Sequence, residues 1–262
     1  MTVKRAAAIL IALISLCSCG AREAVSGEQS AMLTDRRMTP AVPISSPVSE
    51  TSPDTSAESS FLIGTGHEAS HFRDLSPLST EYYMTPVEDY SFERDRDVEF
   101  IMIHFSSNVK AKPEDPYVVD DIKNIYLKGE VSTNYVIDRE GKIYCFIPEY
   151  RCAWHAGVGK WKGDERLKNK MNLYSIGVEL LAMGSEKEML RYISAEQYRA
   201  LPDELVGYTE AQYEALGALI TDICGTYGLP RDRDHIIGHQ EYATKKPDPG
   251  ELFDWDRVIG AH

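Results

Sequence analysis

From about residue 76 onward, short apolar runs alternate with segments in which apolar residues recur at helical spacing. Residues 98–104 are almost continuously apolar, which predicts a strand buried on both faces of a sheet, and residues 176–181 have the same character. Residues 116–128 carry apolar side chains at helical spacing, which predicts a helix that covers the sheet. Residues 135–147, an apolar run interrupted by Arg-Glu-Gly, predict a hairpin.

A longer helix is predicted between Thr209 and Tyr227. Thr209 and Gln212 match the capping box that begins many helices, while Gly228 and Pro230 end the pattern. The expected core face carries Leu216, Leu219, Ile220 and Ile223. Because strands and helices are mixed within one segment, the sequence predicts an α/β fold, a single domain with a central mixed β-sheet flanked by helices.

The amino-terminal region predicts export from the cytoplasm. An apolar run at residues 6–16 follows two basic residues and is about half as long as a bilayer-spanning helix, which is typical of a signal peptide. The next residues, Leu16-Cys17-Ser18-Cys19-Gly20, resemble the lipobox of bacterial lipoproteins. We therefore expect residues 1–19 to be a lipoprotein signal peptide and Cys19 to be acylated. An ordinary secretory signal is the alternative.

Composition separates a linker from the folded domain. Residues 20–75 are rich in Ser, Thr and Pro and contain too few apolar residues to offset the entropy of ordering, which predicts a disordered linker. Residues 76–262 have the size of one domain with a substantial core. The chain has 41 acidic and 28 basic residues, a formal net charge of −13, which argues against a nucleic-acid partner. We expect a monomer.

Two histidines and one aspartate form the strongest candidate site. His104 ends the strand predicted at residues 98–104, and His239 follows a short buried strand that ends at Gly238. Asp248 lies nine residues after His239, in a segment whose prolines and glycine are expected to prevent regular structure. Each residue alone is more often structural. Together, three protein ligands and one open position are the pattern of a catalytic Zn²⁺ site.

Glu179 is the candidate general base. It is a carboxylate within an otherwise apolar strand, where an ionised side chain is costly to bury. Exposure to solvent, or pairing with an arginine, is the alternative. Cys145 and Cys152 are close enough in sequence to form a disulfide, but spacing does not decide whether they do.

Five motifs occur in the order typical of a known family. They are Ile103-His104-Phe105-Ser106, the hairpin from Val136 to Gly141, Trp154-His155-Ala156-Gly157, Ser175 to Leu180, and Gly238-His239 with Asp248-Pro249-Gly250. From about residue 100 to 255 the chain resembles the zinc-dependent N-acetylmuramoyl-L-alanine amidases. This family includes phage lysozyme-type amidases, bacterial cell-wall amidases and animal peptidoglycan recognition proteins.

The resemblance also implies roles for individual residues. His104, His239 and Asp248 would bind zinc, Glu179 would transfer the proton, and Lys246 would stabilise charge near the metal. His155, Trp154 and Asn134 would contact the substrate. Asn134 stands where many relatives have a histidine, and Thr133 stands where some phage enzymes have a catalytic tyrosine, so that tyrosine-assisted mechanism is not expected here.

We therefore expect a membrane-anchored, extracytoplasmic enzyme that faces the cell wall. It would use zinc-activated water to cleave the amide between N-acetylmuramic acid and the L-alanine of the stem peptide, in peptidoglycan or muropeptides. A non-catalytic peptidoglycan recognition module is the alternative. A zinc peptidase that cuts between stem amino acids would use the same metal ligands, but the motifs argue against it.

Overall fold

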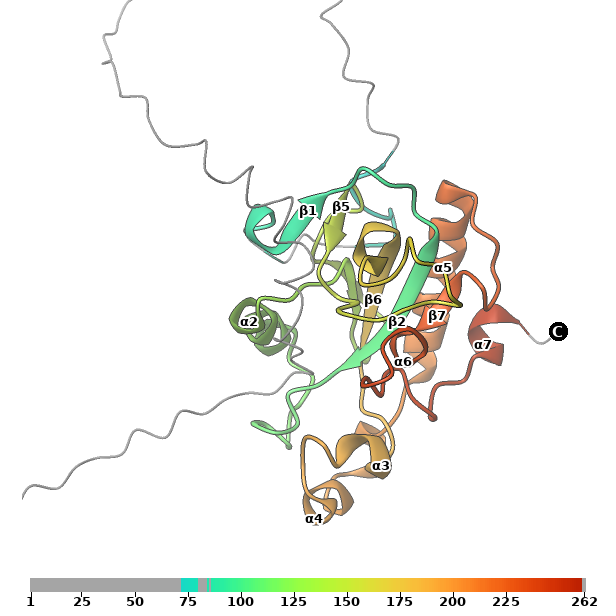
Figure 1. Ribbon diagram of the computed structural model, residues 1–262. Coiled ribbons are helices and arrows are strands. Elements are labelled where there is room, and N and C mark those ends of the chain that lie inside the picture. Colours follow the sequence, from blue (N-terminus) through green and yellow to red (C-terminus); the bar gives the residue numbers. More distant parts are fainter. Residues whose placement is uncertain (1–71, 80–83, 85, 261–262) are drawn as a thin grey trace, which may run out of the picture. The chain divides into compact units, whose positions relative to one another are not determined.

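The computed structural model of the protein describes residues 72–79, 84 and 86–260. Within these ranges the chain forms a five-stranded sheet, a two-stranded sheet and surrounding helices (Figure 1). The strands are β1 (Ser91–Glu93), β2 (Phe100–Ser106), β3 (Tyr135–Ile137), β4 (Ile143–Cys145), β5 (Arg151–Ala153), β6 (Ser175–Leu181) and β7 (Ile236–Gly238). The α-helices are α2 (Val119–Gly129), α3 (Glu186–Met189), α4 (Ala195–Arg199), α5 (Glu210–Tyr227), α6 (His239–Tyr242) and α7 (Asp256–Ile259), and short 3₁₀ helices span Glu88–Tyr90, Met171–Leu173 and Asp203–Leu205. The predicted signal peptide, Cys19 and the linker up to residue 71 lie outside the described residues.

The larger sheet is mixed. Its strand order is β4-β3-β6-β2-β7, in which β3, β6, β2 and β7 run parallel and β4 pairs antiparallel with β3. The central strands β2 and β6 pair along their full length, from Phe100 opposite Ser175 to Ser106 opposite Leu181. Both strands are almost wholly buried, as expected of parallel strands covered on both faces. This arrangement confirms the predicted fold class.

Different layers cover the two faces of this sheet. On one face, residues such as Ile103 and Val178 pack against α5 and α7. On the other face, Val136 and Leu181 pack against α2, whereas Met102 packs against the segment that follows β5. Figure 1 shows α2 and α5 on opposite sides of the sheet. Because side chains alternate along a strand, His104 on β2 projects from the same face as Met102, the second face.

Helix α5 has the bounds that the sequence predicts. The Oγ1 atom of Thr209 accepts the backbone N–H of Gln212, and the Gln212 side chain accepts the backbone N–H of Thr209, each at 3.1 Å. Gly228 ends the helix with a φ of 68°, a left-handed conformation that favours glycine. The local sequence was sufficient to predict the bounds of α5, because residues next to each end of the helix specify where it begins and ends. The predicted strands β2 and β6, the helix α2 and the β3–β4 hairpin are present as well.

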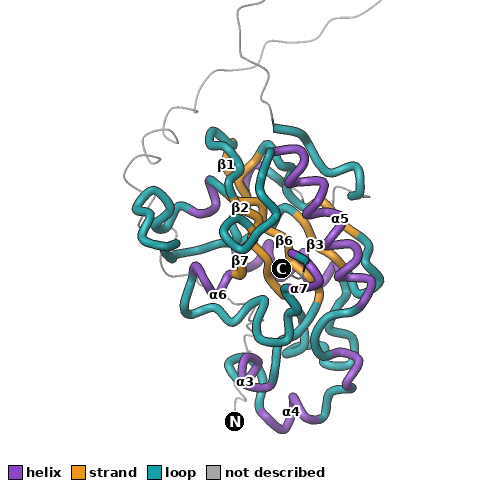
Figure 2. Tube along the Cα trace, turned by 90° about the vertical axis from the view of Figure 1, so that its right-hand side faces the viewer, coloured by secondary structure: helices purple, strands orange, loops and turns teal. Residues whose placement is uncertain are grey.

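Helices α3 and α4 lie together at one end of the domain, away from β1 (Figure 2). They belong to the segment between β6 and α5. This segment shares a small core with the loop after β2, through Val109, Met183, Met189 and Ile193. Glu188 on α3 accepts the backbone N–H of Glu251 at 2.8 Å, so the α3 segment supports the loop that carries Asp248.

The folded unit begins before residue 76, the boundary expected from composition. Phe72 and Leu75 pack against the main core. The guanidinium of Arg73 donates to the Glu149 carboxylate at 2.6 and 3.0 Å and to Asp222 at 2.6 Å. Glu149 is fully buried, and its partner Arg73 is 76 positions away in the chain. Composition over a few residues cannot reveal such a contact, so the boundary was placed too late.

Cys145, Cys152 and Cys224, all in the described part of the chain, are buried and free. Cys145 and Cys152 therefore do not form a disulfide in this structure. Among the described residues, no helix is both long and apolar enough to cross a bilayer.

Candidate metal centre

His104 and His239 come together because two neighbouring parallel strands end at the same edge of the sheet. β2 and β7 pair from Ile101 opposite Ile236 to Ile103 opposite Gly238, so the residue after each of these last partners is a histidine. Ligand sites are common at the carboxyl ends of parallel strands. His239 begins α6, a short helical segment, which corrects the expectation that the chain lacks regular structure from this residue onward.

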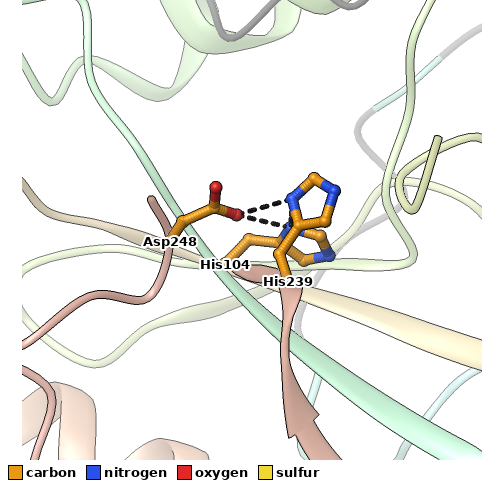
Figure 3. A group of neighbouring side chains, drawn as sticks. All are labelled: His104, His239 and Asp248. Carbon is orange, nitrogen blue, oxygen red and sulfur yellow. Dashed lines mark hydrogen bonds and ion pairs between the residues drawn. The ribbon is translucent and has the colours of Figure 1, made fainter. Parts of the chain in front are cut away.

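Asp248 completes a triangle of potential metal ligands (Figure 3). Its Oδ2 atom lies 2.8 Å from the Nδ1 atom of His104 and 2.8 Å from the Nδ1 atom of His239. The two Nδ1 atoms are 3.0 Å apart, and all three residues are buried. Zinc binds nitrogen and oxygen ligands at about 2.0–2.2 Å. Since each separation is well below twice that length, one ion can contact all three atoms.

The loop that carries Asp248 is held against α6. The backbone N–H of Gln240 donates to the Asp248 carbonyl at 2.9 Å, and the Gln240 side chain accepts the backbone N–H of Gly250 at 3.1 Å. Pro249 lies against Gly238, where an added Cβ would come within 2.8 Å of the proline ring. The Gly-His pair and the Asp-Pro-Gly sequence therefore fit together as one unit, which brings Asp248 back to His239.

The chemistry of the three donor atoms fits a cation. The Nε2 atom of His239 lies 3.1 Å from the Ala156 carbonyl, which can only accept, so Nε2 carries a proton and Nδ1 is the ring nitrogen that faces Asp248. Burial, reinforced by nearby His239, lowers the pKa of His104 to about 4, so its imidazole is neutral at pH 7. Asp248 adds an acceptor oxygen. Buried lone pairs that converge repel one another, and a metal ion relieves that repulsion.

Glu179 stands beside this centre on β6, the strand next to β2, and its side chain is partly buried. Its Oε2 atom accepts the hydroxyl of Ser106 at 2.7 Å, and Ser106 Oγ is also 2.7 Å from the hydroxyl of Tyr126 on α2. Because Ser106 donates to the carboxylate, Tyr126 donates to Ser106. Burial and then the charge of Asp248 raise the pKa of Glu179 to about 8. The carboxyl group is thus held in place and can exchange a proton near neutral pH.

Lys246 lies near both acidic and basic members of the site. Its positive charge opposes the rise in the pKa of Glu179 and contributes to lowering the pKa of His104. Its backbone N–H donates to the Ala243 carbonyl at 2.8 Å, so the position of the residue within the loop is fixed. The preceding Lys245 is exposed.

The residues predicted to contact substrate occupy three different settings. Asn134 is fully buried, its amide N–H groups donate to backbone carbonyls and its oxygen accepts the Gly177 N–H at 3.1 Å, so in this structure it joins strands and has no exposed surface for a substrate to contact. The Trp154 ring packs 5.3 Å from that of Phe92, at the two-stranded sheet, and substrate contact by Trp154 stays a prediction. His155 lies behind His104, where burial holds its pKa well below the ordinary value.

Sequence reasoning missed two residues that surround Glu179. Ser106 lies two positions after His104, and the alternation of side chains along a strand places both on one face, which was a usable signal. Tyr126 had only the pattern of a core helix residue, and its hydroxyl contact depends on how α2 packs on the sheet. Only the tertiary structure connects it to the site.

A centre of two histidines and one carboxylate, beside a partly buried glutamate on the mixed β-sheet of an α/β fold, defines a candidate zinc hydrolase. Comparison with known protein families agrees with a hydrolase. The chain belongs to the N-acetylmuramoyl-L-alanine amidase family Amidase_2, whose family model matches residues 94–251. The matched range contains the three metal-ligand candidates, Glu179 and Lys246.

Individual relatives are of moderate similarity. The chain is 34% identical over 128 residues to the 1,6-anhydro-N-acetylmuramyl-L-alanine amidase AmpD of Enterobacter cloacae, covering 48% of this chain and 54% of the relative. It is 26% identical over 163 residues to the N-acetylmuramoyl-L-alanine amidase AmiD of Escherichia coli K12, covering 62% of this chain and 52% of the relative. The chain thus spans about half the length of these curated relatives. A crystal structure of a selenomethionine AmpD derivative matches with a TM-score of 0.49 at 23% identity, covering 70% of this chain and 93% of that one.

Proposed function

We propose that this protein is a zinc-dependent amidase that hydrolyses the bond between the lactyl group of N-acetylmuramic acid and the L-alanine of the stem peptide. The observation that carries the proposal is the convergence of two imidazole Nδ1 atoms and one carboxylate oxygen within 3.0 Å of one another. Glu179 stands on the adjacent strand. Membership of the amidase family supports this bond as the target.

Each residue has a defined task in this proposal. A bound zinc ion would supply Lewis acidity and lower the pKa of a coordinated water to roughly 7. Glu179 accepts the proton of the attacking water and then donates it to the nitrogen of the departing L-alanine, which requires a carboxyl group that changes protonation state near neutral pH. Ser106 and Tyr126 hold that carboxyl group. Lys246 provides positive charge where the carbonyl oxygen becomes negative.

The proposed substrates are peptidoglycan and the muropeptides released from it. The name of the Enterobacter cloacae relative specifies a 1,6-anhydro-N-acetylmuramyl substrate. Muropeptides that end in the anhydro sugar are therefore the first fragments to test, alongside the same stem peptides on reducing sugars and intact sacculi.

We also propose that the protein is an extracytoplasmic lipoprotein that faces the cell wall. The support is the sequence alone, in which an apolar run of signal-peptide length precedes Cys19. Acyl chains on Cys19 would anchor the protein, and a linker between the anchor and the domain would let the enzyme reach the wall. We propose that the domain acts as a monomer.

The test is to incubate the purified protein with defined muropeptides and to identify the products by mass spectrometry. The amidase proposal expects a free muramyl sugar and a peptide with a new L-alanine amino terminus, formed with zinc and not in excess chelator. Binding of zinc and muropeptide without these products would favour the recognition module. Cleavage between stem amino acids would indicate a peptidase.

A further inference from the structure

A series of hydrogen bonds through His155 and Ser175 connects the Nε2 atom of His104 to the backbone carbonyl of Met171. The Nε2 atom of His104 lies 3.0 Å from the Nδ1 atom of His155, and the Nε2 atom of His155 lies 3.1 Å from Ser175 Oγ. The Ser175 hydroxyl lies 2.7 Å from the Met171 carbonyl oxygen. All three side chains are buried.

The direction of every hydrogen bond in this series follows from its last member. A carbonyl oxygen can only accept, so Ser175 donates its proton to Met171. Ser175 Oγ must then accept from the Nε2–H of His155, which leaves a lone pair on the Nδ1 atom of His155. That lone pair accepts the Nε2–H of His104. The Nδ1 atom of His104, which faces Asp248 and His239, is therefore unprotonated.

We propose that His155 and Ser175 are positioning residues, which fix the tautomer and the ring plane of His104 so that its Nδ1 atom binds the metal. The proposal rests on the proposed zinc site and adds residues that support it. Residues behind a ligand histidine commonly contribute 10- to 100-fold to metal affinity. Here the support comes from a second histidine whose own orientation is fixed by a serine.

The surrounding backbone is built to hold His155 in this place. Gly177 lies on the same face of β6 as Ser175, and a Cβ added there would come within 2.6 Å of the His155 ring. The backbone N–H groups of His155 and Ala156 both donate to Asn172 Oδ1, at 3.1 and 2.8 Å. Three alternate positions of β6 therefore have different tasks. Ser175 supplies a hydrogen-bond acceptor, Gly177 leaves space for the His155 ring, and Glu179 supplies the carboxylate.

This role differs from the substrate contact expected for His155. The residue is 9% exposed, and each ring nitrogen already has a partner, His104 on one side and Ser175 on the other. A substrate group would have to displace one of these partners to bind the ring.

Two substitutions of His155 separate hydrogen bonding from packing. His155→Asn keeps an acceptor oxygen near the position of Nδ1, whereas His155→Leu has nearly the same volume and no acceptor. Titration with zinc in competition with a chromophoric chelator should give a 10- to 100-fold weaker affinity for His155→Leu and recovery to within a few-fold of wild type for His155→Asn. Wild-type affinity in His155→Leu would overturn the proposal, as would equal losses in both variants.

Ser175→Ala provides a milder test that keeps the His155 ring. It should weaken zinc binding because it removes the group that orients His155. Ser91→Ala is the matched control, since Ser91 is also a buried strand serine whose hydroxyl donates to a backbone carbonyl, that of Val87, and it lies in the two-stranded sheet. Equal zinc affinities in Ser175→Ala and Ser91→Ala would contradict the role of Ser175.

A spectroscopic readout is independent of both zinc binding and amidase activity. Long-range ¹H–¹⁵N correlation spectra of the metal-free protein should show His104 and His155 as neutral Nε2–H tautomers, and in Ser175→Ala the tautomer of His155 should no longer be fixed. A protein that binds no zinc would refute the proposed function and still permit this test. An Nδ1–H tautomer of His104 in the wild type would refute the series of hydrogen bonds.

Discussion

His104 and Glu179 are direct neighbours across the pairing of β2 with β6. Neighbouring strands are about 4.8 Å apart, and paired residues on parallel strands project from the same face of the sheet. A candidate metal ligand and a candidate proton carrier are therefore set side by side by strand register, without any loop between them. The carboxyl group of Glu179 can be tolerated in this apolar strand because its side chain is only partly buried and accepts the hydroxyl of Ser106.

The proposed zinc site predicts a gain in thermal stability when zinc is added. Zinc should raise the melting temperature of the wild type, because a ligand at about 1,000 times its Kd stabilises the folded state by about 4 kcal/mol. His239→Ala should lose most of this shift in calorimetry. His235→Ala is the control, since His235 pairs with Asp232 and is not part of the three-residue centre. A full zinc-induced shift in His239→Ala would exclude His239 as a ligand.

The raised pKa of Glu179 predicts a pH-dependent stability in the metal-free protein. Between its ordinary pKa of about 4.3 and the folded value of about 8, the folded state holds a proton that the unfolded state has lost. Its contribution to stability is therefore fully present below about pH 4 and is lost as the pH rises through about 8. Glu179→Gln cannot titrate and should lack this component.

The comparison is the difference in melting temperature between wild type and Glu179→Gln, measured in chelator from pH 5 to pH 9. The wild type should lose stability relative to the glutamine variant as the pH rises, and the difference should level off above pH 8. A constant difference across this range would show that the carboxyl group is not perturbed.

The ion pair at the start of the domain predicts a stability cost for its removal. Arg73→Met leaves the buried Glu149 carboxylate without its cation, although Tyr135 and Tyr227 still donate to it. Loss of a hydrogen bond to a charged group typically costs about 1.5–3 kcal/mol. Chemical denaturation should show a decrease of this size. Arg96→Met, at an exposed ion pair with Asp95, should change stability by less than about 0.5 kcal/mol, and equal effects would contradict a role for residues 72–75 in the fold.

The lipoprotein proposal predicts that Cys19 determines membrane attachment. The full-length protein should partition with membranes and carry acyl chains, and Cys19→Ala should abolish the modification. Metabolic labelling with a fatty-acid analogue, followed by fractionation, measures both. Cys17→Ala is the control, because Cys17 lies two residues before the cysteine that is expected to be acylated. A Cys19→Ala protein that stays in the membrane fraction would refute the anchor.

The sequence predicted those parts of the structure that depend on nearby residues. The capping box at Thr209 and the stop at Gly228 define α5, and the apolar runs define β2 and β6. The metal-ligand candidates could be found because His104 lies in an apolar strand and His239 directly follows one. Contacts set by tertiary packing could not be predicted in the same way. The hydroxyl of Tyr126, the burial of Asn134 and the pairing of Arg73 with Glu149 all depend on which elements pack together.

The central claim is that Glu179 transfers the proton during amide hydrolysis, and one comparison tests it most directly. Wild type and Glu179→Gln are loaded to equal zinc content, and release of the peptide with an L-alanine amino terminus is followed by mass spectrometry. Glutamine retains the shape of the side chain but cannot carry the proton, so turnover should fall by about 10²–10⁴-fold while zinc and muropeptide binding are retained. Undiminished turnover in Glu179→Gln would show that another residue is the base.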